Sequence, residues 1–147
     1  MEFCTLTEKE FRSFLEKSPE RTFLQTPEIG KLREKSGWKV EYLGVKEGKK
    51  VIAATMMTSR VMHFGYKEFY APRGLLVDYK NKELLTFFTN SLKKHVKENK
   101  GYEFRIDPYV INVERNSAGE IVEGGVDNRE IRTTLEELGY KRIKTEN

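Results

Sequence analysis

The stretch Gly101-Tyr-Glu-Phe-Arg-Ile-Asp-Pro-Tyr109 decides the fold that we expect for this chain. From Tyr102 to Asp107, apolar side chains alternate with charged ones, which is the period of a β-strand with two unlike faces. Pro108 stops the strand because proline has no backbone N–H and restricts the residue before it to extended geometry. We therefore expect Asp107 at the carboxyl end of a central strand, where ligands bind in open α/β sheets.

A long amphipathic helix leads into this strand. Asn81 is a suitable N-cap, and Gly101 is expected to end the helix as a left-handed cap. Apolar residues recur at helical spacing between them, so the helix should pack one face against a sheet. They are Leu84, Leu85, Phe88, Leu92 and Val96.

Two shorter helices are expected near the start of the chain. Thr7-Glu-Lys-Glu10 has the spacing of a capping box, in which two side chains satisfy two backbone N–H groups. Thr26-Pro27 marks the second start, because Thr caps well and Pro suits the first helical position. Gly37 is expected to close this helix, with Ile29 and Leu32 facing inward.

Strand signals surround these helices. Trp38–Val45 and Lys50–Thr58 read as the two arms of a hairpin. The segment Val51–Met57 is apolar on both faces, so the second arm should be central in the sheet. Glu2–Leu6 fits an edge strand, and Tyr140–Ile143 fits a last strand.

The remaining C-terminal part contains a loop and a helix. Asn112–Val126 is rich in glycine and polar residues and reads as a loop. The capping box Asp127-Asn-Arg-Glu130 starts a final helix, and Gly139 ends it. The order is then β, α, α, β, β, β, α, β, α, β. This order predicts an α+β domain with the acetyltransferase-like (GNAT) fold, a central mixed, mostly antiparallel sheet flanked by helices.

Composition sets limits on this interpretation. The 147 residues fit one domain, and 37% hydrophobic with 34% charged residues suits a folded, well-solvated protein. The net charge of +4 suits either solubility or a phosphate-bearing partner. Cys4 is the single cysteine, so no internal disulfide is possible. No apolar run approaches the ~20 residues of a membrane span, and no signal peptide is recognisable. We expect a cytosolic protein.

One loop argues against the chemistry usual for the GNAT fold. Enzymes of this fold that use acetyl-CoA need Arg/Gln-x-x-Gly-x-Gly/Ala before the long helix, so that backbone N–H groups hold the pyrophosphate. The corresponding segment here is Ala71–Asp78, and that spacing is absent. The fold thus suggests acyl transfer, whereas the loop argues against CoA as the donor.

Five segments, in order over nearly the whole chain, resemble the Fem family of peptidoglycan bridge-forming aminoacyltransferases. The most similar members are those tied to β-lactam resistance in streptococci and staphylococci. The segments are Phe23–Thr26, Lys35–Trp38, Val51–Ala54, Tyr70–Gly74 followed by Asp78-Tyr79, and Arg105–Tyr109.

The resemblance implies a function in cell-wall biogenesis. Family members transfer an amino acid from aminoacyl-tRNA to the lysine side chain, or the growing branch, of the lipid-linked peptidoglycan precursor, without metal or CoA. This chain resembles only the first of their two GNAT-like halves, so residues 1–147 are expected to form one GNAT-like domain. We expect it to fold without catalysing transfer alone, to meet tRNA mainly through the missing part, and to work in the cytoplasm, with peripheral contact at the inner membrane face.

Three site residues follow from the resemblance. Lys35 matches a lysine that contacts the precursor's phosphates, whereas Tyr102 and Asp107 match residues that line the acceptor site. Asp107, the candidate catalytic residue, would orient the acceptor ammonium or take its proton. Each also has a purely structural interpretation: a solvated helix end for Lys35, a core aromatic for Tyr102 and a turn-initiating Asp-Pro for Asp107. A non-catalytic GNAT-like module that binds a muropeptide precursor or a partner protein is the alternative function.

Overall fold

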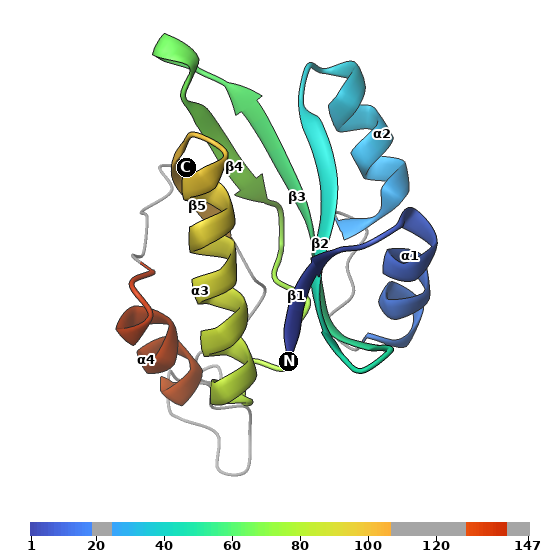
Figure 1. Cartoon of the computed structure of the whole chain (residues 1–147), viewed down its shortest axis with the longest axis vertical. Coiled ribbons are helices and arrows are strands. Elements are labelled where there is room, and N and C mark those ends of the chain that lie inside the picture. The colour runs from blue at the N-terminus through green and yellow to red at the C-terminus, as the bar shows by residue number, and fades with distance from the viewer. Residues whose placement is uncertain (19–24, 107–128, 141–147) are drawn as a thin grey trace, which may run out of the picture. The chain divides into compact units, whose positions relative to one another are not determined.

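The computed structural model describes residues 1–18, 25–106 and 129–140. The chain divides into two compact units, Met1–Pro108 and Tyr109–Asn147. The described residues of the first unit form the sheet and the helices α1, α2 and α3 (Figure 1). In the second unit, the described element is α4 (Arg129–Glu137). That residues 1–147 form one GNAT-like domain stays a prediction.

A five-stranded mixed sheet forms the first unit, in the order β1-β2-β3-β4-β5. Neighbours from β1 to β4 are antiparallel, whereas β4 and β5 are parallel. The predicted mixed, mostly antiparallel sheet with an N-terminal edge strand is therefore confirmed. The strands are β1 (Glu2–Thr5), β2 (Lys39–Glu47), β3 (Lys50–Val61), β4 (Lys67–Ala71) and β5 (Gly101–Ile106).

Helices cover both faces of this sheet. α1 (Glu8–Lys17) and α2 (Pro27–Lys35) lie on one face, and α3 (Lys82–Glu98) lies on the other (Figure 1). On the α1 side, the rings of Phe11 and Tyr42 stack with centroids 4.8 Å apart. On the α3 side, the predicted apolar stripe is buried throughout, and the ring of Phe88 lies 6.4 Å from that of Phe3.

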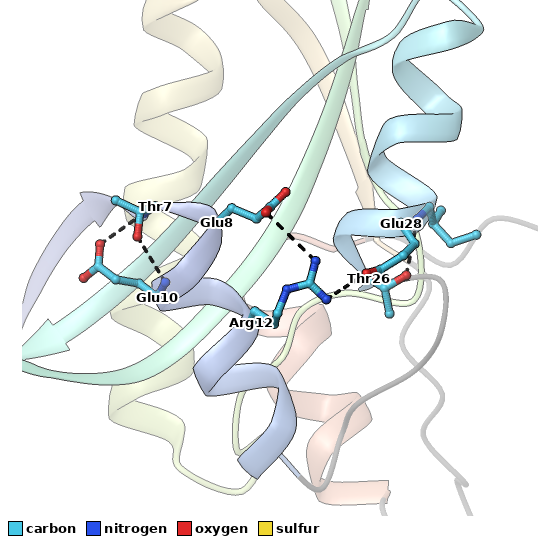
Figure 2. Close-up of polar contacts among 7 residues, drawn as sticks. Thr7, Glu8, Glu10, Arg12, Thr26 and Glu28 are labelled. Carbon is cyan, nitrogen blue, oxygen red and sulfur yellow. Dashed lines mark hydrogen bonds and ion pairs between the residues drawn. The ribbon is translucent and has the colours of Figure 1, made fainter.

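Polar contacts fix the starts of α1 and α2. The predicted capping box is present, because Thr7 and Glu10 each bond the other's backbone N–H at 3.1 Å (Figure 2). Arg12 joins the two helices through Glu28 at 2.7 Å. Its hydrogen bond holds the pKa of Glu28 below the ordinary value. Thr26 caps α2, as expected.

The second arm of the predicted hairpin is the centre of the described sheet. β3 pairs with β2 on one side and β4 on the other, and residues 53–59 are all buried. A buried strand that is apolar on both faces was predicted here, and this is confirmed.

The inward face of α2 was predicted wrongly in part. Leu32 is 58% exposed, although Ile29 is partly buried as expected. The contact surface includes Gly30 instead, where an added Cβ would lie 3.0 Å from the Sδ atom of Met56. The helix approaches the sheet through a residue without a side chain, which a pattern of apolar residues does not reveal.

The end of α3 also differs from the prediction. Asn99 is the C-cap, and Lys100 takes the left-handed conformation with φ +61°. Gly101 already belongs to β5, and a Cβ there would clash with Val96 and Phe69. Gly101 is needed for close packing between α3 and the sheet, and Lys100 provides the left-handed turn that ends the helix.

β5 is last in the described strand order rather than central, with β4 as its only partner among the residues described. Of the predicted strand Tyr140–Ile143, only Tyr140 lies within the described residues. The loop Asn112–Val126 and the cap at Asp127 lie outside them. Gly139 follows α4 with φ +96°, as predicted for a helix end.

None of the helices in the described ranges has the length and apolar character to cross a bilayer. The same part of the chain contains no group of three or more His, Cys, Asp or Glu side chains arranged to hold a metal ion.

Candidate functional site

A charged cluster spans three neighbouring strands. Glu68 on β4 accepts from Arg60 Nε on β3 at 3.1 Å and from Arg105 Nη2 on β5 at 3.2 Å. The Glu68 side chain is only 8% exposed, whereas those of Arg60 and Arg105 are 47% and 42% exposed. A buried carboxylate thus holds two accessible guanidinium groups in fixed positions. We call these three residues the arginine cluster.

Each arginine of the cluster also stacks on an aromatic ring. Arg60 lies over Trp38 with its guanidinium carbon 4.5 Å from the ring centre. Arg105 lies over Tyr70 at 5.0 Å. These cation–π contacts reduce the freedom of both side chains and leave their outer N–H groups accessible. The result is a preorganised surface rather than a set of mobile surface charges.

Strand register explains why these side chains share one face. Arg60 pairs with Glu68 across β3 and β4, and Tyr70 pairs with Arg105 across β4 and β5. Directly paired residues point to the same side of a sheet. Phe69 points to the opposite side, where its ring contacts His95 of α3. The arginine cluster therefore lies on the face that α1 and α2 share.

The cluster suits an anionic ligand. Two arginines and one glutamate leave a net positive charge, and each guanidinium uses one nitrogen for Glu68. Within the described residues, the buried Nε of Arg105 has no hydrogen-bond partner. Guanidinium groups bind carboxylates and phosphates through paired N–H donors. This face can therefore bind a ligand that carries anionic oxygens.

Of the three predicted site residues, Lys35 and the backbone of Tyr102 lie within the described part of the chain. Lys35 is exposed in the last turn of α2, three residues before the ring of Trp38 that supports Arg60. Tyr102 is in β5, opposite a register shift of β4, and is described in its backbone only. Asp107 lies outside the described residues. Its neighbour Ile106 ends β5, five residues and ~17 Å from Gly101.

Tyr102 is the second residue of β5, whereas Ile106, the last described residue before Asp107, ends that strand. That Lys35, Tyr102 and Asp107 converge at one sheet edge stays a prediction. A ligand that reached both ends would have to be extended.

The segment in the position of a pyrophosphate loop has its backbone engaged elsewhere. Gly74 N–H donates to Ala71 O at 3.0 Å, Leu75 N–H to the Tyr79 hydroxyl at 2.7 Å, and Leu76 N–H to Ala54 O at 2.9 Å. A pyrophosphate site needs successive N–H groups that point at the ligand. Three of them are already satisfied here.

A buried amide holds this segment against β3. Gln25 is fully buried, and its Nε2 donates to Met56 O at 3.2 Å and to Pro72 O at 2.8 Å. Its Oε1 accepts from Met56 N–H at 2.8 Å. β4 ends at Ala71, and Pro72 has no N–H with which to continue the ladder. Beyond the end of β4, the side-chain amide of Gln25 instead bonds the backbone C=O and N–H of Met56 in β3.

Sequence reasoning missed both the arginine cluster and Gln25. The register that forms the cluster follows from a turn centred on Phe64, which places Arg60 opposite Glu68. The Gly65-Tyr66 pair in the sequence would suggest a later turn and a different partner for Arg60. The sequence around Gln25 gave no signal of its burial. Glutamine is ordinarily a surface residue, and the hydrogen-bond partners of Gln25 are backbone atoms far along the chain.

The fold defines the class: this is a protein with the GNAT fold, and three backbone N–H groups of the loop after β4 are engaged within the protein. Solved structures agree on the fold. Glucosamine-6-phosphate N-acetyltransferase from Arabidopsis thaliana covers 99% of this chain and 95% of its own, with a TM-score of 0.56 at 15% identity. At that identity the likeness shows the fold alone.

The sequence comparisons then identify the family. A family model described as the FemAB family matches residues 6–143, so the chain belongs to this family. It is 37% identical over 142 residues to the aminoacyltransferase FemA of Staphylococcus epidermidis. A crystal structure of FemX superposes with a TM-score of 0.76 at 27% identity and covers 96% of this chain.

The match covers unequal shares of the two proteins. The alignment with FemA takes in 96% of this chain but 34% of the relative, and that with FemX takes in 32% of the solved chain. The chain therefore spans about a third of the length of the relatives it matches. FemA, the relative with this alignment, is named an aminoacyltransferase.

Proposed function

We propose that this chain is the acceptor-binding part of an aminoacyltransferase that builds the interpeptide bridge of peptidoglycan. The amino acid would come from aminoacyl-tRNA and go to the lysine side chain, or a started branch, of the lipid-linked precursor. The protein would work in the cytoplasm at the inner face of the membrane, and its activity would contribute to β-lactam resistance. tRNA would bind mainly through residues beyond this chain.

The observation that carries the proposal is the arginine cluster, found on a chain of the FemAB family. Its guanidinium groups are fixed on aromatic rings, and their outer edges are accessible. A muropeptide precursor carries phosphates and peptide carboxylates, which are the groups that arginine binds best. CoA would lack its usual pyrophosphate site, because the loop after β4 has its N–H groups engaged.

Each residue then has a separate role. Lys35 provides a point charge for the diphosphate, whereas Arg60 and Arg105 orient anionic groups further along the acceptor. Asp107 orients the acceptor ammonium and takes its proton as the amine attacks the ester. Tyr102 lines the path between these positions.

The length of the acceptor fits this distribution. The two ends of β5, Gly101 and Ile106, lie ~17 Å apart. An extended peptide of five residues spans at most about 17 Å. A precursor whose phosphates lie near Lys35 can therefore place a peptide amine near the end of β5 without folding back.

Chemical-shift mapping with a soluble nucleotide-linked muropeptide tests the site. We expect shifts at Lys35, Trp38, Arg60 and Arg105, and a weaker affinity for Arg105→Ala. Arg12→Ala is a matched control, because Arg12 is also paired with a glutamate but lies between α1 and α2. Shifts confined to α4, or equal losses in both variants, would reject the site.

A non-catalytic binding module is the second candidate function. The observation that favours it is the arginine cluster itself, whose accessible guanidinium groups can bind an anionic ligand without any chemistry. An assay of amino-acid transfer from charged tRNA to a lipid-linked precursor separates the two candidates. Transfer by an enzyme that contains this domain supports the aminoacyltransferase, and its absence supports the binding module. Both candidates share the acceptor site.

A further inference from the structure

The turn between β3 and β4 exposes apolar side chains at one end of the sheet. The short 3₁₀ turn η2 (His63–Gly65) joins these strands. Val61, Phe64 and Tyr66 are 65%, 99% and 55% exposed. They are three of the five exposed large hydrophobic residues in the described ranges. We call residues 61–66 the apolar tip, which ends the β3–β4 hairpin (Figure 1).

Phe64 is unfavourable in two respects at this position. Its backbone has φ +60° and ψ +24°, a left-handed conformation that residues other than glycine and asparagine rarely adopt. Its side chain is almost completely exposed, so packing within the described residues does not account for it. Such an outlier is a reason to look for a function.

Lysines surround the apolar tip. Lys67 follows it directly and pairs with Val61. The lysines at this end of the sheet are Lys35, Lys39, Lys67 and Lys100, in the last turn of α2, at the starts of β2 and β4, and directly before β5. The glutamates here include Glu68, which is held by two arginines, Glu34 beside Lys35, Glu98 at the end of α3, and Glu103 in β5, which pairs with Glu68. The β2–β3 turn at the other end has no exposed large hydrophobic residue.

We propose that the apolar tip docks on the surface of an anionic lipid bilayer. Phe64 and Tyr66 lie at the level of the headgroups, and the surrounding lysines face lipid phosphates. Aromatic side chains favour the interface between water and lipid, and clustered lysines favour an anionic leaflet. Apolar exposure and positive charge occur together at this end of the sheet, and a bilayer surface satisfies both.

The orientation that results agrees with the proposed function, on which this part of the inference rests. A lipid-linked acceptor keeps its diphosphate at the bilayer surface. Lys35 lies at the same end of the sheet as the apolar tip, so it would meet that diphosphate. β5 then runs away from the membrane, and its far end lies ~17 Å deeper in the cytoplasm.

Vesicle sedimentation tests the docking without any precursor. The 147-residue chain is mixed with vesicles of equal parts phosphatidylglycerol and phosphatidylcholine, and with vesicles of phosphatidylcholine alone. We expect binding to the anionic vesicles that weakens with salt. Phe64→Asn should lower the partition coefficient about tenfold, equivalent to ~1.4 kcal/mol. Its melting temperature should be unchanged or higher, because asparagine tolerates the left-handed conformation.

Leu32→Ser is the matched control, since it removes an exposed apolar side chain from α2 rather than from the tip. It should bind vesicles as the parent chain does. The proposal is overturned if the parent chain ignores anionic vesicles, if Phe64→Asn binds them equally well, or if both variants lose the same affinity. Binding by this chain but not by a longer form would also overturn it, because the tip would then be covered by protein.

Failure here and failure of the proposed function have different signatures. Vesicle binding without muropeptide binding would support the tip and reject the acceptor site. Muropeptide binding without vesicle binding would support the acceptor site and reject membrane docking by the apolar tip.

Discussion

Replacement of Gln25 by alanine tests how the sheet is completed beyond the end of β4. The side chain makes three hydrogen bonds of 3.2 Å or less to the backbone of Met56 and Pro72. All are buried, so alanine removes these three bonds and a longer one from the Thr55 hydroxyl at 3.4 Å. It leaves one backbone N–H and two backbone C=O groups without these partners. At about 1 kcal/mol net for each bond, the free energy of unfolding should fall by about 3 kcal/mol.

Urea unfolding followed by Trp38 fluorescence measures this change, because Trp38 is the single tryptophan and lies in the first unit. The matched variant is Gln25→Glu, which keeps the shape and the acceptor for Met56 N–H but has no donor at neutral pH. It should lose most of the same stability. A loss below about 1 kcal/mol in Gln25→Ala, or full tolerance of glutamate, would refute the hydrogen-bond explanation.

Three further outcomes are expected. Glu68→Gln should weaken muropeptide binding roughly threefold to tenfold, because Arg60 and Arg105 lose the charge that fixes them. The free energy of unfolding by urea should also fall, by about 1 to 3 kcal/mol, because this carboxylate is buried and bonds both guanidinium groups. Acid should destabilise the fold, because Lys46 and Arg12 lower the pKa values of Glu10 and Glu28. The contribution of these two carboxylates to stability is complete above the ordinary pKa of 4.5 and is lost as pH falls through the lowered pKa. Melting temperatures measured at several pH values test this. The chain alone should transfer no amino acid from charged tRNA above background in a precursor assay; measurable transfer would contradict this.

Local signals in the sequence identified most of the elements. Helix starts at Thr7 and Thr26 were predictable because side-chain caps act within three residues. The central position of β3 was predictable because a strand buried on both faces is apolar throughout. These features depend on neighbours in the sequence or on a simple period.

Features that depend on distant partners were not predictable in the same way. Gly30 and Gly101 look like ordinary glycines, yet each permits a close approach that only the tertiary structure reveals. Lys100 takes a left-handed turn that the adjacent glycine would have been expected to take.

The candidate site was only partly visible for the same reason. Lys35 came from family resemblance, and the structure adds that it lies at the end of the sheet near Trp38 and Arg60. In the sequence, Glu68 is a single acidic residue in a short strand. Only the register of β4 with β3 and with β5 shows that Arg60 and Arg105 lie next to it. A site assembled across strands therefore needs the register before its chemistry can be recognised.

Calorimetry with two ligands tests the central claim most directly. The same 147-residue chain is titrated with a nucleotide-linked muropeptide and, separately, with acetyl-CoA. We predict heat and a defined affinity for the muropeptide, a weaker affinity in Arg105→Ala, and no measurable binding of acetyl-CoA. Micromolar binding of acetyl-CoA, about −8 kcal/mol, with no response to the muropeptide would contradict the account.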